Sequence, residues 1–274
     1  MIDITTKPFK STLIADRNTE DLYTEPGDFQ SVKNAMNQYV LKFSKNGKKL
    51  YLVGEGYSPE GNKPFLDEFD LATKKTKRLW QADGISTYEQ IIDVIDYEKG
   101  ILLTAIESKT ENMNYYIRTI GAKAPVKITN FPHPYESFKN VYKEKIRYKR
   151  EDGVELSATL YLPADYDRKS GKKLPMIMWA YPKEFKSASA AGQVSTSPHE
   201  FTYLSYGTPI YWAAAGYAIL DDADFPIIGE GTTEPNDLFI KQLVANAKAA
   251  IDAVDALGYI DRTKVGVGGH SYGA

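Results

Sequence analysis

The sequence contains no cysteine among its 274 residues. This absence excludes disulfide bonds, zinc–thiolate sites and thiol catalysis, because each of them needs a cysteine sulfur. It does not by itself assign a cellular compartment. Nothing else in the sequence indicates a bound metal ion or cofactor, and we expect neither.

The chain also has little net charge and no long apolar run. A formal net charge of −2 at pH 7 gives no general attraction to nucleic acid or to an anionic membrane. The longest apolar stretch, Pro209 to Leu220, is too short to span a bilayer. The first ten residues lack the basic start and apolar run of a secretory signal. We expect neither a nucleic-acid nor a membrane partner, and compartment and oligomeric state stay unassigned.

What is present is the composition of a folded globular protein. Hydrophobic residues make up 42% and charged residues 26% of the chain, which is enough apolar material for a core. The length leaves room for one large or two ordinary domains. The basic run over residues 74–78 is typical of a solvated turn and strand edge rather than of a polyanion site.

Short strand patterns separated by turns dominate residues 38–129. Two sets of them repeat about 50 residues apart, as in the pairs Leu50 and Ile101, Phe65 and Tyr116, and Leu79 and Ile128. That period is typical of the four-stranded blades of a β-propeller, where each blade must stack on its neighbours. Two units therefore imply further blades, and an ordinary antiparallel sheet is the alternative.

Pro132 and Pro134 indicate a boundary, because two prolines so close continue neither a strand nor a helix. Beyond it the sequence predicts a hairpin turning at residues 151–153 and buried strands over residues 174–180 and 217–223. A helix over residues 235–257 and a strand over residues 264–268 follow. This order predicts the front half of a doubly wound α/β sheet and divides the chain into residues 1–135 and 136–274.

The predicted helix is the best defined element of the chain. Pro235 suits its first turn, and Gly258 is a natural stop. Its apolar face at helical spacing comprises Phe239, Ile240, Leu243, Val244, Ala247, Ile251, Val254 and Leu257.

The chain ends in Gly269-His270-Ser271-Tyr272-Gly273, the G-x-S-x-G pattern of a nucleophile elbow. The serine of such an elbow sits on a sharp, strained turn between a strand and a helix, so the flanking positions carry almost no side chain. The turn lifts the Ser271 hydroxyl out of the sheet. The backbone N–H of Tyr272 then points at a developing oxyanion.

Phrases throughout the chain resemble the prolyl oligopeptidase family of serine peptidases, and most of all its glutamyl endopeptidase branch described from chloroplasts. They are DLYTEPG, SPEGNKPFLDEFD, ESKTENMNYY, ITNFPHPY, IRYKREDGVELSATLYLP, WAYPKEF, AAGQV, PIIGEG and GVGGHSYGA. The resemblance implies the last blades of a β-propeller followed by the front half of an α/β-hydrolase domain, with the active site between them. It also implies that Ser271 is the nucleophile, with the Tyr181 hydroxyl and the Tyr272 N–H as oxyanion donors.

The same resemblance implies a peptidase that acts on peptides or unfolded polypeptides, cleaving after acidic residues. Pro182-Lys183 stands where the broader family often has Gly-Gly, which is the form associated with the glutamyl branch. Lys183 and Lys186 are candidates to pair with an acidic substrate side chain, although solvated surface lysines have the same pattern. Glu230 lies in a glycine-rich loop, and we expect it to shape that loop rather than transfer protons.

A catalytic serine needs a base, and the base needs an orienting carboxylate. In α/β-hydrolases both follow the serine, whereas His133 and His199 precede Ser271. The side chain of His270 is expected to leave the elbow in another direction. We therefore expect a fragment that ends just after the nucleophile, with its aspartate and histidine downstream, and we expect these residues alone to be inactive.

Three alternatives stay open. An esterase or acylaminoacyl-peptidase of the same fold would share the elbow. A dinucleotide-binding protein is suggested by Gly266 and Gly268 after a strand, but Ser271 stands in the place of the third glycine. A propeller scaffold that binds a partner without catalysis is the last alternative.

Overall fold

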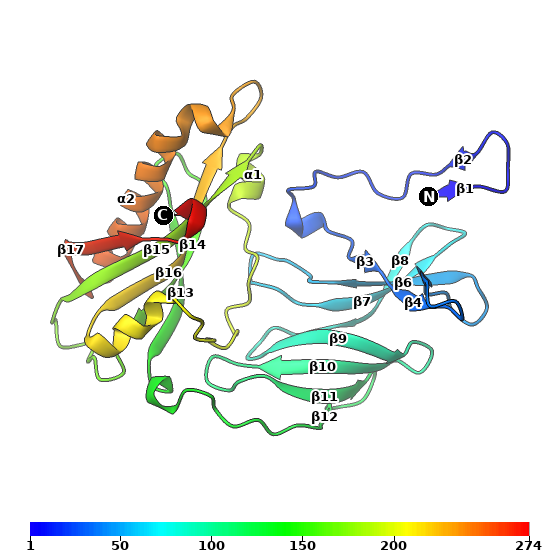
Figure 1. Cartoon of the computed structure of the whole chain (residues 1–274), viewed down its shortest axis with the longest axis horizontal. Helices are drawn as coiled ribbons and strands as arrows, with labels where there is room; N and C mark the ends of the chain where they lie inside the picture. Colours follow the sequence, from blue (N-terminus) through cyan, green and yellow to red (C-terminus); the bar gives the residue numbers. More distant parts are fainter. Residues whose placement is uncertain (274) are drawn as a thin grey trace.

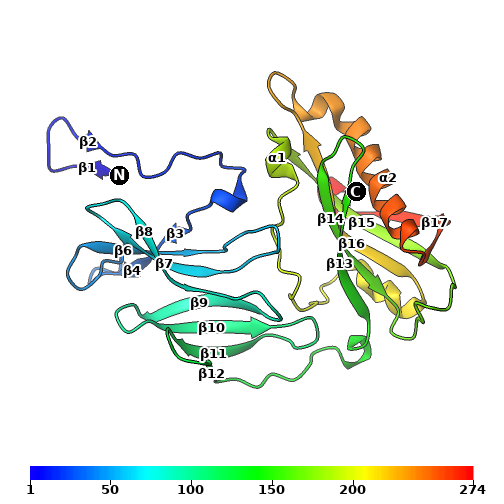
Figure 2. The same cartoon turned by 180° about the vertical axis from the view of Figure 1, so that it is seen from behind.

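The computed structural model describes residues 1–273, and its elements form two groups. One group is built from the antiparallel strands of the first half of the chain. The other is a mixed sheet from the second half, with one long helix on its outer face (Figure 1). The view from behind shows the same two groups, joined by connecting segments (Figure 2).

The first half forms two four-stranded antiparallel sheets in succession. Their strands are β3 (Asp28–Phe29), β6 (Lys49–Gly54), β7 (Phe65–Asp70), β8 (Thr76–Gln81), β9 (Tyr88–Asp96), β10 (Ile101–Glu107), β11 (Asn114–Thr119) and β12 (Val126–Lys127). The sheet orders are β3-β6-β7-β8 and β12-β11-β10-β9. The basic run at residues 74–78 forms the turn before β8 and the start of that edge strand, as the sequence predicts.

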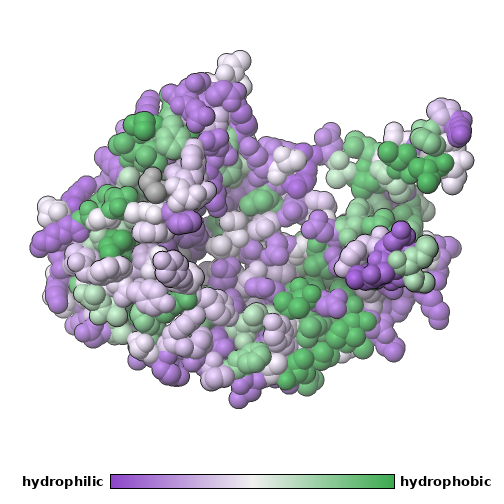
Figure 3. All heavy atoms as spheres, in the orientation of Figure 1, coloured by the Kyte–Doolittle hydropathy of each residue, from purple (hydrophilic) through white to green (hydrophobic). Residues whose placement is uncertain are grey.

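The two sheets share an apolar core. Tyr51 and Leu66 of the first sheet pack with Val94 and Leu102 of the second. Leu66 and Leu102 are completely buried. Apolar side chains also gather on the surface over β9 to β12 (Figure 3); they include Ile92, Ile95, Val126 and Ile128.

The first strand pattern of residues 38–129, near residue 40, forms a strand that lies outside the two four-stranded sheets. It is β5 (Tyr39–Leu41), which pairs with β4 (Ser31–Lys33) in a separate two-stranded sheet. An isolated bridge between Phe43 and Leu50, and the hydrogen bond from the Ser44 N–H to the Lys49 carbonyl at 2.9 Å, connect this segment to the first four-stranded sheet. The reason is that β3 already pairs with β6 through Leu52 and Val53.

The second half forms a five-stranded sheet. Its strands are β13 (Tyr142–Lys149), β14 (Glu155–Leu162), β15 (Leu174–Phe185), β16 (Ala218–Ile228) and β17 (Ile260–Gly268). Their order is β13-β14-β16-β15-β17. The predicted hairpin is present as the antiparallel β13–β14 pair, and Gly153 takes the left-handed conformation, with a φ of 89°, in its turn. Strand β15 runs parallel to both β16 and β17.

The predicted helix is α2 (Phe239–Ala256), which follows the 3-10 turn η4 (Pro235–Leu238). Its predicted apolar face is wrong in part, because Ile240 and Val244 are 69% and 61% exposed. Gln242 and Asn246 are buried instead. Gln242 exchanges two hydrogen bonds with the backbone of Ile228, at 2.9 and 2.7 Å. The helix is therefore fixed to the end of β16 by polar side chains that a hydrophobic pattern does not detect.

Short elements connect these sheets. They are β1 (Ile2–Asp3), β2 (Lys10–Ser11), η1 (Leu22–Thr24), η2 (Glu136–Phe138), α1 (Ala188–Ala191), η3 (Pro209–Ala215) and η5 (Ser271–Gly273). Within residues 1–273, no helix is long and apolar enough to cross a membrane.

Candidate active site

Ser271 is the first residue of η5 (Ser271–Gly273), in the turn that follows the end of β17. It is one of four non-glycine residues with a positive φ in the described chain, at 56°. A side chain in this region of backbone space is strained, and such strain gathers at functional sites. The conformation is the one that a nucleophile elbow requires of its serine, and the Ser271 side chain is exposed.

Two glycines pack the elbow against β15. A Cβ atom on Gly269 would lie 2.0 Å from the carbonyl oxygen of Gly273, and one on Gly273 would lie 2.4 Å from that of Ala180. Atoms do not approach so closely, so neither position accepts a larger residue without a shift of the backbone. The N–H of Gly273 donates to the carbonyl of His270 at 2.9 Å and closes the turn. A Cβ on Gly273 would also lie 3.3 Å from the Cα of Tyr181, so the turn that begins at Ser271 packs against the backbone of Ala180 and Tyr181.

Tyr181 and Tyr272 lie side by side at the elbow. Their ring centroids are 6.1 Å apart with the planes tilted by 59°. The Tyr272 hydroxyl donates to Oε1 of Glu184 at 2.7 Å, and this hydrogen bond raises the pKa of Tyr272. Tyr181 is 47% exposed. Among the described residues its hydroxyl has no hydrogen-bond partner, which leaves it available to a ligand.

The two candidate lysines differ in their surroundings. Lys186 pairs through Nζ with Glu234, and its backbone N–H donates to the carboxylate of Glu20. Lys183 is exposed and lines a cavity together with Tyr181. Of the two, only Lys183 lines the cavity beside Tyr181. Glu230 accepts a hydrogen bond from the N–H of Ala188 at 2.7 Å, consistent with the expected role in shaping its loop.

The cavity beside Tyr181 has a volume of about 290 Å³. Its remaining walls come from three segments: Glu20 and Leu22; Glu184, Phe185, Ala190, Ala191, Gln193 and Ser195; and Asp222, Ala223, Asp224, Phe225 and Pro226. The contribution of residues 20–22 was not predicted as part of a site. Their only sequence signal is the phrase DLYTEPG, which the family resemblance includes.

A bulge in β16 shapes the floor of this cavity. Met178 pairs with Leu220 and Ala180 with Ala223, so β16 carries one residue more than β15 between these pairs. Asp222 takes up the extra length with a φ of 49°. Burial raises the pKa of Asp221 to about 6.

Asp224 lies two residues beyond the bulge. Its Oδ2 atom accepts from both the N–H and the Oγ of Ser157 at 2.7 Å, while burial raises its pKa.

The histidines have other surroundings. His133 accepts from the N–H of Tyr135 at 3.1 Å and its ring stacks edge-on to Phe201. Burial lowers the pKa of His199. Within residues 1–273, no histidine hydrogen-bonds to Ser271. The elbow thus carries Ser271 and Tyr272, and its packing on the end of β15 brings the Tyr272 ring beside that of Tyr181.

The arrangement of sheets is that of solved peptidases. A putative dipeptidyl aminopeptidase IV from Bacteroides ovatus matches 90% of this chain and 36% of its own length, with a TM-score of 0.57 and 16% identity. Oligopeptidase B from Trypanosoma brucei matches 86% of this chain and 34% of its own length, with a TM-score of 0.50 and 13% identity. At this level of identity the likeness shows the fold alone.

Two curated relatives are far more similar in sequence. This chain is 45% identical over 279 residues to a probable chloroplastic glutamyl endopeptidase of Oryza sativa subsp. japonica, which covers 98% of the chain. Its counterpart in Arabidopsis thaliana is 43% identical over 274 residues and covers 96%. The chain spans 30% and 28% of the relatives' own lengths. No protein-family model matches it. The resemblance to the glutamyl endopeptidase branch of the prolyl oligopeptidase family is confirmed.

Proposed function

We propose that the full-length protein is a serine peptidase that cleaves peptide bonds by acyl transfer, with Ser271 as the nucleophile. The observation that supports this proposal best is the left-handed conformation of Ser271 on a turn that two glycines pack against Ala180 and Tyr181. The sheet order β13-β14-β16-β15-β17 suits the front half of an α/β-hydrolase domain over residues 136–274. The paired sheets of residues 1–135 suit the last blades of a propeller.

In this mechanism the Ser271 hydroxyl attacks the scissile carbonyl. The Tyr181 hydroxyl and the Tyr272 N–H hold the oxyanion that forms, since charge developing in the transition state is stabilised by fixed donors. The proton of Ser271 goes to a histidine oriented by a carboxylate, both of them following the serine in the chain as in other α/β-hydrolases. The histidine passes that proton to the leaving amine as the C–N bond breaks, and water, activated by the same histidine, then hydrolyses the acyl-enzyme and restores the Ser271 hydroxyl. Residues 1–274 alone are then inactive.

We further propose that the substrate is a peptide or an unfolded polypeptide cleaved after glutamate. The relatives' name supports glutamate as the preferred residue. Lys183 supports it locally, because it is a cation exposed beside Tyr181. A charge-assisted hydrogen bond from an ammonium group to a carboxylate is about twice as strong as a neutral one.

Labelling of the full-length protein with a fluorophosphonate tests the nucleophile. We expect covalent labelling and glutamyl-peptide cleavage in the wild type, and loss of both in Ser271→Ala. The control is Ser170→Ala, an exposed loop serine that should change neither. A wild type that takes no label would favour the non-catalytic propeller scaffold. Faster turnover of simple esters than of glutamyl peptides would favour an esterase or acylaminoacyl-peptidase.

A further inference from the structure

A segment from the first half of the chain reaches the candidate active site. Residues 20–23, here called the arm, lie at the start of η1, and Figure 1 shows this blue segment beside α1 of the second half. Its long-range hydrogen-bond partners are 166 to 172 residues away. Local bonds, such as that from Arg17 to the carbonyl of Asp21 at 2.8 Å, hold the arm as well, so tertiary contacts and its own turn position it together.

One side chain makes three of these contacts. The Oε1 atom of Gln193 accepts from the N–H groups of Leu22 and Tyr23, at 2.7 and 3.4 Å. Its Nε2 atom donates to Oδ1 of Asp21 at 2.7 Å, and this bond lowers the pKa of Asp21. Gln193 therefore hydrogen-bonds to three consecutive residues of the arm, and these bonds fix the direction of the arm's backbone.

Two further contacts hold the ends of the arm. The carboxylate of Glu20 accepts from the backbone N–H of Lys186, at 2.9 and 3.0 Å to its two oxygens. The Tyr23 hydroxyl accepts from the N–H of Val194 at 2.8 Å. Lys186 directly follows β15, the strand that carries Tyr181, whereas Gln193 and Val194 come just after α1.

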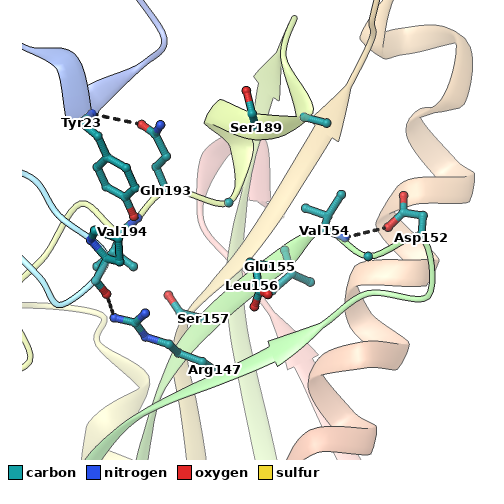
Figure 4. Close-up of a pocket in the computed structure, with 14 residues that line it drawn as sticks. Tyr23, Arg147, Asp152, Val154, Glu155, Leu156, Ser157, Ser189, Gln193 and Val194 are labelled. Atoms are coloured by element: carbon teal, nitrogen blue, oxygen red, sulfur yellow. Dashed lines mark hydrogen bonds between the residues drawn. The ribbon is translucent and has the colours of Figure 1, made fainter.

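The arm lines two cavities. Glu20 and Leu22 line the cavity of about 290 Å³ beside Tyr181. Tyr23 lines a second cavity of about 630 Å³, shown in Figure 4 with the hydrogen bond between Tyr23 and Gln193. Gln193 lines both cavities. Leu22 is therefore an apolar wall of the space next to the proposed oxyanion donor, and displacing the arm would alter that space.

We propose that the arm is a specificity-determining wall of the substrate site, with Leu22 limiting the size of one peptide residue and Gln193 as the residue that positions the arm. This inference rests on the proposed peptidase function. It assigns the residue preference at one substrate position to the first half of the chain, whereas Ser271 and Tyr181 come from the second half.

Profiling of the full-length protein with peptide libraries that vary one position at a time tests the inference. Leu22→Ala enlarges the cavity and Leu22→Trp fills it, so the preference for large over small apolar residues should shift about tenfold in opposite directions at the same position. Gln193→Ala should weaken that preference through KM, with kcat little changed. The matched control is Leu13→Ala, an exposed leucine of the same N-terminal region.

Fluorophosphonate labelling of Ser271 in every variant separates the two proposals. If labelling and cleavage persist while all Leu22 variants keep the wild-type profile at every position, the arm is not a specificity wall and this inference fails. If the wild type itself takes no label, the peptidase function fails instead. Thermal unfolding of each variant shows whether a changed profile comes from an intact protein.

Discussion

Tyr181 is the residue whose role depends most on its position. It lies at the point where β15 reaches the elbow, its hydroxyl has no partner among the described residues, and its ring rests beside that of Tyr272. A tyrosine that served only in packing would have a smaller exposed fraction of its side chain. Half exposure beside a strained serine suits a hydroxyl that meets a ligand.

Replacement of Tyr181 by phenylalanine tests this role in the full-length enzyme. We expect kcat to fall by about 100- to 1000-fold, because one oxyanion donor is lost, while KM changes little. Tyr272→Phe is the matched control, since its proposed donor is the backbone N–H and survives the change. Near wild-type turnover in Tyr181→Phe would remove this hydroxyl from the oxyanion site.

The individual residues of the candidate site could be predicted from the sequence to different degrees. The glycine pattern around Ser271 was sufficient to predict a tight turn there, while the roles of Ser271 and of the Tyr272 N–H stay predictions. Tyr181 came only from the family resemblance, because nothing local distinguishes it from a core tyrosine at the end of a strand. The partner of Lys186 could not be predicted, since Glu234 is 48 residues away and the pair forms only in the folded chain.

Among the elements, the elbow depends on backbone contact more than on side chains. The carbonyl of Ala180 lies where a Cβ on Gly273 would stand, and the turn folds so tightly that Gly269 has no space for one either. Close packing leaves such sites little freedom to relax. The turn and the end of β15 therefore behave as one rigid unit.

We expect Gly269→Ala to destabilise the protein by about 1–3 kcal/mol through overpacking and to abolish fluorophosphonate labelling. Gly266→Ala in the preceding strand β17 is the control, because a Cβ there meets only the Met176 carbonyl oxygen at an ordinary 3.9 Å. Denaturant unfolding and labelling of both variants check the prediction. Equal behaviour of the two would show that the elbow tolerates a side chain beside its serine.

The elements themselves were largely predictable. Strand periodicity predicted strands in both halves of the chain, and Pro235 and Gly258 predicted the bounds of the helical region. The first turn of that region is the 3-10 turn η4 rather than α-helix. The orientation of α2 was predicted less well. Its buried face includes Gln242 and Asn246, which bond to the backbone of β16, and such long-range polar partners leave no periodic signal in the sequence.

For the whole molecule, the connection between the two groups of sheets contains a buried carboxylate. Glu107 of β10 is 5% exposed and accepts from the N–H of Phe201 and the hydroxyl of Tyr203, at 3.2 and 2.9 Å. Burial raises its pKa above the ordinary 4.5. The folded state therefore favours the protonated carboxyl group.

This shift gives stability a defined dependence on pH. The contribution of Glu107 to the free energy of unfolding is fully present below about pH 4.5, where the carboxyl group is protonated in both the folded and the unfolded state. As the pH rises from there through the raised pKa of the folded state, the unfolded state releases its proton first, and this contribution is lost. We expect Glu107→Gln to flatten this decline in unfolding free energy. The exposed Glu111→Gln is the control, and an unchanged slope in Glu107→Gln would contradict the prediction.

The arrangement of the whole molecule was the hardest part to predict. The repeat and the two prolines indicated two parts, but not that residues 20–23 of the first would enclose a cavity of the second. Contacts across more than 160 residues depend on the completed fold, and neither propensity nor spacing encodes them locally.

The long stretch of sequence between the arm and Gln193 has a consequence for synthesis of the protein. The arm leaves the ribosome long before Gln193, and closing so long a loop costs entropy that only later contacts repay. A nascent chain therefore carries its arm unattached until the second sheet has assembled. The pocket beside Tyr181 gains its last wall only then, so a growing polypeptide has no finished groove in which to hold a peptide.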